Sequence, residues 1–295
     1  MMENKLRTVM SERGGAVEKR IDELLSERDD DFACLIDAVR YSALGPGKKV
    51  RAFLTTEFAR LGGAALEDSL TYAAIIEMIH AASLIHDDLP CMDDDDMRRG
   101  RPSCHIAYGE DTALLAGDAL MVYPYEIISK LDNKGDKEKL EAIRIISSAS
   151  GMYGMIGGQQ MDISGESRSV EKLTKLQGLK TGRMIRAAAL LGCVASGNFE
   201  GSDLYKRAIE YADNIGLAFQ IIDDLLDVTG DPEKLGKKVG MDEKNGYLTF
   251  AGLMSYEDAF DLAAMKTAQA CAAIADIDGS EILVSLAKEL LMRES

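Results

Sequence analysis

The chain has 295 residues, 46% of them hydrophobic, which is ample for a globular fold with a sizeable core. Its formal net charge is -16 and its pI is about 4.7, so nucleic acid or an anionic membrane surface would meet general repulsion. We therefore expect no nucleic-acid partner, and any anionic ligand must be held by a local basic site.

The five cysteines are scattered and form no CxxC pair, which argues against a disulfide framework or a thiolate zinc site and favours a cytoplasmic protein. The N-terminal residues are charged and lack the apolar region of a secretory signal. The most apolar stretch, residues 71–85, is interrupted by Glu77 and His80 and is too short to cross a bilayer. We therefore expect no integral membrane segment.

Helix-forming residues dominate the chain, and proline occurs at only five positions. Apolar residues recur every three to four positions over residues 179–191 and again over 209–222, which predicts two helices with one buried face each. Strand signals are weak, most glycine and proline interruptions are too short to be linkers, and there is no repeat period. The sequence therefore predicts a single all-α domain over residues 1–295.

The first basic element is Gly45-Pro46-Gly47-Lys48-Lys49-Val50-Arg51. It is not a P-loop, because the residue after Lys48 is Lys49 rather than Ser or Thr. A diphosphate site fits these residues better, with His80 as a further donor. The alternative is ordinary surface charge for Lys48 and Arg51, and a core position for His80.

An acidic cluster follows, with six aspartates between Asp87 and Asp96 and then three arginines before Pro102. Pro90 should end the preceding helix, so that carboxylates converge from a helix end and the following turn. An EF-hand is excluded, because Arg98 would stand at the third ligand position. Arginines suit a phosphate held beside metal ions instead.

A second cluster, Asp223-Asp224-Leu225-Leu226-Asp227, repeats this chemistry. A helix would place Asp223 and Asp227 on one face, about 6 Å apart between Cβ atoms. The residues before them are apolar, so the carboxylates would need a counter-cation to stay ionised, and Mg²⁺ prefers such oxygen ligands. A solvated acidic helix face is the alternative, and it would be the better interpretation of an isolated cluster.

Taken together, the motifs resemble those of the trans-isoprenyl diphosphate synthases over nearly the whole span from Tyr41 to Phe250. The segment from His80 to Pro102 is similar to the first aspartate-rich motif of that family. The other matching motifs are, in the order of the family, Gly117-Asp118, Gly158-Gln159-x-x-Asp162, Lys180-Thr181-Gly182, Phe219-Gln220-x-x-Asp223-Asp224-x-x-Asp227 and Gly236-Lys237-x-x-Gly240-x-Asp242. The resemblance implies an isoprenoid synthase-type helical bundle around a central cavity, and a homodimer.

The resemblance also implies a role for each matching residue. The ligands of a cluster of three Mg²⁺ ions would be Asp87, Asp93 and Asp223, supported by Asp88 and Asp227. The allylic diphosphate would be held by Arg98, Lys180 and Lys237. Isopentenyl diphosphate, the acceptor, would be held by Lys48, Arg51, His80 and Arg99. The catalytic residues facing the carbocation would be Lys180, Thr181 and Gln220.

The implied reaction is a head-to-tail condensation of isopentenyl diphosphate with dimethylallyl, geranyl or farnesyl diphosphate. The allylic carbon–oxygen bond ionises, the acceptor alkene attacks the cation, and the released pyrophosphate removes a proton. The products would be farnesyl (C15) or geranylgeranyl (C20) diphosphate.

Two segments depart from the family pattern. The usual Gly-Gly-Lys-Arg-x-Arg-Pro is replaced by residues 46–52, which keep Lys48 and Arg51 but alter the turn. The usual Lys-x-Thr-Tyr-Pro is replaced by Tyr247-Leu248-Thr249-Phe250-Ala251, which lacks both the lysine and the proline. The second change puts one accessory diphosphate contact in doubt.

Product length depends on the helix before Asp87. Bacterial farnesyl diphosphate synthases usually have Tyr five residues before that aspartate, where this chain has Ala82, followed by Ser83. A small side chain favours growth past C15 toward C20, with a deeper floor from Met78, Ile79, Tyr123 or Tyr125. Alternatively, another helix fills the gap and the product is C15.

Two other functions compete with this interpretation. A terpene cyclase would share the fold but normally has a different second metal motif and needs no acceptor site. A non-catalytic subunit of a heteromeric synthase would be expected to have lost one aspartate cluster, and both are present here.

Overall fold

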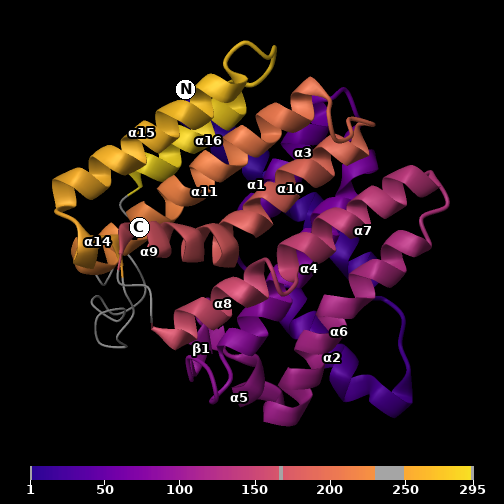
Figure 1. Cartoon of the computed structure of the whole chain (residues 1–295). Helices are drawn as coiled ribbons and strands as arrows, with labels where there is room; N and C mark the ends of the chain where they lie inside the picture. The colour runs from indigo at the N-terminus through magenta and orange to yellow at the C-terminus, as the bar shows by residue number, and fades with distance from the viewer. Residues whose placement is uncertain (1, 166–168, 230–248, 294–295) are drawn as a thin grey trace.

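The computed structural model describes residues 2–165, 169–229 and 249–293, and their fold is a bundle of helices (Figure 1). The prediction of an all-α chain is confirmed. The helices are α1 (Met2–Leu24), α2 (Ala33–Ala43), α3 (Val50–Leu61), α4 (Leu66–Asp87), α5 (Cys104–Tyr108), α6 (Glu110–Ser129), α7 (Asp136–Ser150), α8 (Met155–Ser164), α9 (Val170–Gln177), α10 (Arg183–Ala195), α11 (Asp203–Thr229), α14 (Phe250–Leu253), α15 (Tyr256–Ile274) and α16 (Glu281–Met292).

Four short elements accompany these helices. A 3₁₀ turn, η1 (Asp30–Phe32), precedes α2, and a π-helical turn, η2 (Gly178–Gly182), leads into α10. The strands β1 (Met97–Arg98) and β2 (Arg101–Pro102) form a small antiparallel hairpin between α4 and α5. The helices predicted over residues 179–191 and 209–222 are therefore present, but the first begins as a π turn.

Helix α4 lies at the centre of the fold, where it packs against α1, α3, α6 and α10. Its side chains are buried on every face from Ser69 to Ala82, as expected of a helix that is apolar all round. Helix α11 packs against α10 on one side and α15 on the other, and α16 lies beside α15 (Figure 1). The central helix therefore carries the first aspartate cluster at its C-terminal end, and α11 carries the second.

One hydrophobic cluster runs through most of the bundle, from Leu6 in α1 to Ala287 in α16. A smaller cluster joins the last turns of α11 to α9, α14 and α15. Among the helices of the described residues, none combines the length and the apolar character that a membrane span requires.

Candidate active site

The first aspartate cluster is built by the end of α4 and the turn that follows it. Asp87 is the last residue of the helix, and Pro90 lies in the turn. The chain then folds back, because the Asp93 N–H donates to the Asp87 carbonyl at 2.9 Å and the Asp94 N–H donates to the Leu89 carbonyl at 3.2 Å. Asp94 adopts a left-handed φ of 53°, which aspartate tolerates better than most residues. The turn thus brings Asp93 back to Asp87, as the sequence predicted.

The Asp87 carboxyl is held in an environment that disfavours its charge. Burial raises its pKa to about 6; Asp93 adds to the increase, and Lys180 opposes it. A cation beside this group would keep it ionised near neutral pH. The oxygen atoms of such a carboxylate pair are therefore suitable ligands for a hard divalent metal ion.

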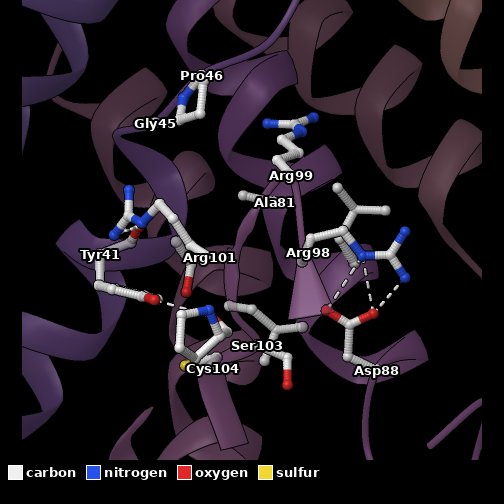
Figure 2. A pocket seen from close by; sticks show the side chains of 14 residues that line it. Tyr41, Gly45, Pro46, Ala81, Asp88, Arg98, Arg99, Arg101, Ser103 and Cys104 are labelled. Carbon is white, nitrogen blue, oxygen red and sulfur yellow. Dashed lines mark hydrogen bonds and ion pairs between the residues drawn. The ribbon is translucent and has the colours of Figure 1, made fainter. Parts of the chain in front are cut away.

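The β1–β2 hairpin places two neighbouring arginines on different parts of the site. Its two-residue turn, Arg99–Gly100, has φ values of 53° and 76°, both in the left-handed region that two-residue hairpin turns require. Arg98 Nε donates to Asp88 Oδ1 at 2.9 Å (Figure 2). Arg98 Nη2 also donates to Asp95 Oδ2 at 3.1 Å. Asp88, which is only 2% exposed, is therefore held by an arginine.

Lys180 lies in the π turn and faces the acidic groups of α4 and α8. Its Nζ is 2.5 Å from Asp162 Oδ2. Burial lowers its pKa, but the carboxylates of Asp162, Asp87 and Asp93 outweigh that effect, so the pKa is raised and the ammonium stays charged. In the sequence, Asp162 belongs to a matching motif but has no assigned role; its contact with Lys180 makes it the residue that positions this lysine.

The neighbouring residues Thr181 and Gln220 are also in contact. Thr181 Oγ1 donates to Gln220 Oε1 at 3.1 Å, which links the π turn to α11. The turn lies very close to α8, where a Cβ on Gly158 would be 2.3 Å from the Lys180 backbone nitrogen. Only glycine fits this approach, and this explains why the Gly158-Gln159-x-x-Asp162 motif begins with one.

The second aspartate cluster lies on α11 as predicted, but its members have different surroundings. Asp223 Oδ1 accepts a hydrogen bond from Arg293 Nη2 at 2.6 Å, and the buried Asp224 accepts one from the Phe250 N–H at 2.7 Å. Asp227 is buried one helical turn beyond Asp223. The site thus gains Arg293, which no motif in the sequence had indicated.

Among the described residues, no group of three or more acidic, histidine or cysteine side chains is close enough to hold one metal ion. Asp223 pairs with Arg293 and Asp88 with Arg98. The donors fit Mg²⁺ in chemistry, because they are carboxylates next to cations that suit phosphate. Lys237, a predicted ligand of the allylic diphosphate, lies outside the described residues.

A separate basic pocket, of about 160 Å³, lies between α3, α4, α10, α11 and α16. It brings together all four residues that the sequence assigned to the acceptor diphosphate, and it adds two cations. The polar residues that line it are Lys48, Lys49, Arg51, Glu77, His80, Arg99 and Arg293. Apolar side chains complete the lining, and the Arg293 guanidinium lies 4.3 Å from the centre of the Phe219 ring.

His80 is neutral in this pocket. Burial and the nearby cations, Arg51 and Arg99 first among them, hold its pKa well below its usual value. Its Nε2 is 3.4 Å from Arg99 Nη2, and because a guanidinium has no acceptor, this nitrogen is the accepting one. The Arg51 guanidinium has its pKa lowered by burial, which the carboxylate of Glu77 opposes.

The residues proposed to control chain length lie in the C-terminal third of α4. Ala82 is fully buried, and the Ser83 hydroxyl donates to the His80 carbonyl at 2.9 Å. Met78 and Ile79 are fully buried about one turn earlier. Tyr123 instead donates its hydroxyl to the Leu24 carbonyl at 3.2 Å and lines a groove between α1, α2 and α6. Met78 and Ile79 are therefore better placed than Tyr123 to lie beneath Ala82.

A sequence profile of the polyprenyl synthetases matches residues 33–277. The chain belongs to this family. The farnesyl diphosphate synthase of Escherichia coli K12 is 42% identical over 233 residues, which are 76% of each chain. The geranylgeranyl diphosphate synthase of Cyanophora paradoxa is 37% identical over 295 residues, covering 98% of this chain and 97% of the relative.

Solved structures of polyprenyl synthetases have the same fold. An FPP/GFPP synthase from Zymomonas mobilis superposes with a TM-score of 0.86 at 34% identity, covering 99% of this chain and all of that one. Geranylgeranyl pyrophosphate synthetase from Pyrococcus horikoshii superposes with a TM-score of 0.88 at 27% identity over the full length of both chains. Since these family members are named for different products, overall similarity does not decide the product of this one.

Proposed function

We propose that this protein is a short-chain trans-prenyltransferase that condenses isopentenyl diphosphate with allylic diphosphates. The observation that carries the proposal is that the chain has two different sites for anionic ligands. One combines carboxylates with Lys180, and the other is a pocket of cations around His80. A terpene cyclase has no use for the second site. A non-catalytic subunit has no use for two complete aspartate clusters.

The allylic diphosphate binds at the carboxylate side. Asp87, Asp93 and Asp223 would hold Mg²⁺, with Asp88 and Asp227 in support. The three ions expected from the family would supply positive charge beside the departing diphosphate. Asp223 accepts a hydrogen bond from Arg293 through Oδ1, and a carboxylate has a second oxygen that could bind a metal ion. Lys180, kept charged by Asp162, and Arg98 bind the diphosphate oxygens, and Lys237 is the third predicted cation.

Ionisation leaves a carbocation next to the π turn. The Thr181–Gln220 hydrogen bond fixes two oxygen atoms at that position, and the Lys180 carbonyl is the third dipole that faces the cation. The acceptor, held through its diphosphate by Lys48, Arg51 and Arg99, presents its double bond to the cation. Neutral His80 contributes a hydrogen bond without adding charge. The released pyrophosphate takes the proton, so no side-chain nucleophile is needed.

The product that we propose is longer than C15 because residue 82 is alanine. The small side chain is the basis for a C20 preference, with Met78 and Ile79 as the deeper floor. The C15 product remains the second candidate, because curated relatives with either name are similarly close to this chain.

We further infer one domain over residues 1–295, a cytoplasmic location and a homodimer. The single-domain inference is supported by the hydrophobic cluster that extends from α1 to α16. The location rests on the scattered cysteines of the sequence. A partner surface is suggested by the exposed side chains of Leu114, Leu115 and Val122, which lie along one face of α6.

The test is product formation by the purified protein. It is incubated with Mg²⁺, isopentenyl diphosphate and, separately, C5, C10 and C15 allylic primers, and the products are sized by chromatography. We expect each primer to be elongated and C20 to be the end point. Failure to elongate any primer would rule out the synthase function, whereas a C15 end point would rule out only the C20 preference.

A further inference from the structure

The loop that carries Lys48 and Lys49 into the acceptor pocket has a side-chain contact of its own, in which Lys49 Nζ donates to the Gly45 carbonyl at 3.4 Å. It connects the end of α2 to the start of α3 and contains Gly45, Pro46 and Gly47. Lys49 occupies the N-cap position of α3 with a φ of 44°, and a lysine side chain has no acceptor with which to cap the helix. Other parts of the chain must therefore hold both ends of this loop.

Arg101, on the β1–β2 hairpin, holds the end that follows α2. Its Nη1 and Nη2 donate to the carbonyls of Leu44 and Tyr41, both at 3.4 Å. Its guanidinium carbon lies 3.9 Å from the centre of the Tyr41 ring, and the Tyr41 hydroxyl donates to the Pro102 carbonyl at 2.8 Å (Figure 2). A cation placed on the last carbonyls of a helix satisfies orphan acceptors and complements the helix dipole.

The same hairpin lies close to the loop itself. A Cβ on Gly45 would be 3.3 Å from Arg101 Nη1, and one on Gly47 would be 3.1 Å from Arg99 Nη1. In Figure 2, Gly45 and Pro46 lie above Arg101 and to the left of Arg99. The two arginines therefore lie against the loop while one of them, Arg99, also lines the acceptor pocket.

Glu77, on α4, holds the other end of the loop. It is 7% exposed, and its Oε1 accepts a hydrogen bond from the Ala52 N–H at 3.0 Å. Ala52 lies in the first turn of α3, where backbone N–H groups have no partner within the helix, so this carboxylate does the capping that Lys49 cannot do. Glu77 is also the carboxylate in the pocket whose charge opposes the lowering of the Arg51 pKa by burial.

We propose that Arg101 and Glu77 are positioning residues for the acceptor diphosphate, which fasten the two ends of the loop that bears Lys48. Both belong to the segment from α4 to the hairpin that also carries Asp87 and Asp88, so one rigid unit sets the distance between the metal-side carboxylates and the acceptor cations. The inference rests on the proposed function and deepens it, because neither residue needs to touch the substrate.

The test compares Arg101→Leu and Glu77→Ala with wild type. Binding of isopentenyl diphosphate is measured by calorimetry, and KM is measured separately for the acceptor and for an allylic primer. We expect the Kd and KM for isopentenyl diphosphate to rise about tenfold in each variant, equivalent to about 1.4 kcal/mol. The KM for the primer should stay within about twofold, since the allylic contacts are unchanged.

Two further variants separate positioning from general stability. Glu77→Gln keeps an oxygen that accepts the Ala52 N–H and removes one negative charge, so it should bind isopentenyl diphosphate at least as tightly as wild type. Arg207→Leu is the matched control, because Arg207 also donates to a carbonyl in the last turn of a helix, that of Ala273 in α15, at 3.1 Å. It should lower the melting temperature without changing either KM.

Unchanged acceptor binding in Arg101→Leu and Glu77→Ala would overturn the proposal, and so would an equal rise in both KM values. If Arg101→Leu does not fold, Arg101→Gln, which retains one donor for the two carbonyls, replaces it under the same criteria. Failure of the proposed function would look different: the wild-type protein itself would form no product from any primer, whatever the calorimetric ranking of the variants.

Discussion

At the scale of single residues, Ala82 is the side chain on which the product length is proposed to depend. We expect Ala82→Tyr to shift the product from C20 to C15, because the phenol would occupy the buried space beside α4 that a longer chain needs. The measurement is chromatographic sizing of products from a C10 primer. Ala82→Ser is the matched control, since it adds a single heavy atom and should leave the distribution as it is. An unchanged distribution in Ala82→Tyr would place the floor elsewhere.

Asp87 gives a prediction about stability and pH in the metal-free protein. Burial raises its pKa to about 6 from an ordinary value of 3.8. Between these values the folded state binds more protons than the unfolded state, so this group makes stability fall as pH rises through that window. At pH 7 the buried charge therefore costs stability, and at pH 3.5 the folded state is protonated and the unfolded state is mostly protonated.

We accordingly expect Asp87→Asn to stabilise the metal-free protein at pH 7 by about 2 kcal/mol and to have little effect near pH 3.5. Urea denaturation with EDTA present, at both pH values, measures this difference. Asp261→Asn, on the exposed face of α15, controls for the general loss of an acidic group. Stabilisation that persists unchanged at pH 3.5 would contradict the role of the buried charge.

At the scale of elements, the contact between α8 and the π turn decides where Lys180 lies. We expect Gly158→Ala to destabilise the protein by about 1 to 3 kcal/mol and to lower kcat, because a Cβ there would be 2.3 Å from the Lys180 nitrogen. Thermal unfolding and steady-state kinetics measure the two effects. A wild-type melting temperature in this variant would mean that the two elements separate freely.

Gly178→Ala is the control within the same π turn. A Cβ at position 178 would have no atom within 4 Å, and the residue has an ordinary right-handed conformation. Replacing such a glycine reduces the entropy of the unfolded chain, so this variant should be equal to wild type or up to about 1 kcal/mol more stable. If Gly158→Ala destabilises the protein and Gly178→Ala does not, the close approach of α8 to the π turn is the cause of the destabilisation.

The elements also show what the sequence could and could not predict. Helices with one buried face were predictable from the spacing of apolar residues, and Pro90 marked the turn that returns Asp93 to Asp87. The π turn at Lys180 was not, since it depends on the approach of Gly158 from a different helix. The contacts of Arg101 and Glu77 were equally hidden, because each joins residues far apart in the chain, and no local pattern encodes them.

Arg293 illustrates the same limit between elements. Its partners, Asp223 and Phe219, lie about seventy positions earlier on α11. In the sequence, a single arginine that follows an apolar helix cannot be told from any other cationic residue near a helix C-terminus. Only the packing of α16 near α11 brings it to the point where the second aspartate cluster and the acceptor pocket meet.

At the scale of the whole molecule, α6 presents an unusual surface for a helix so close to the central one. Leu114, Leu115 and Val122 are 47%, 55% and 66% exposed, and their spacing of seven and eight residues puts them on one face. The opposite face of α6 is buried against α4 and α2. An apolar stripe on an ordered helix is what an interface between two copies requires.

We therefore expect the wild-type protein to be a dimer and the double variant Leu115→Glu, Val122→Glu to be monomeric by light scattering at micromolar concentration. Two carboxylates in the centre of a self-complementary interface meet their own copies across the two-fold axis, so repulsion and desolvation both oppose association. Leu140→Glu is the control, because Leu140 is 67% exposed on α7 and its loss should leave the dimer intact. A double variant that remains dimeric would exclude this face of α6 as the interface, and a monomeric wild-type protein would exclude the homodimer.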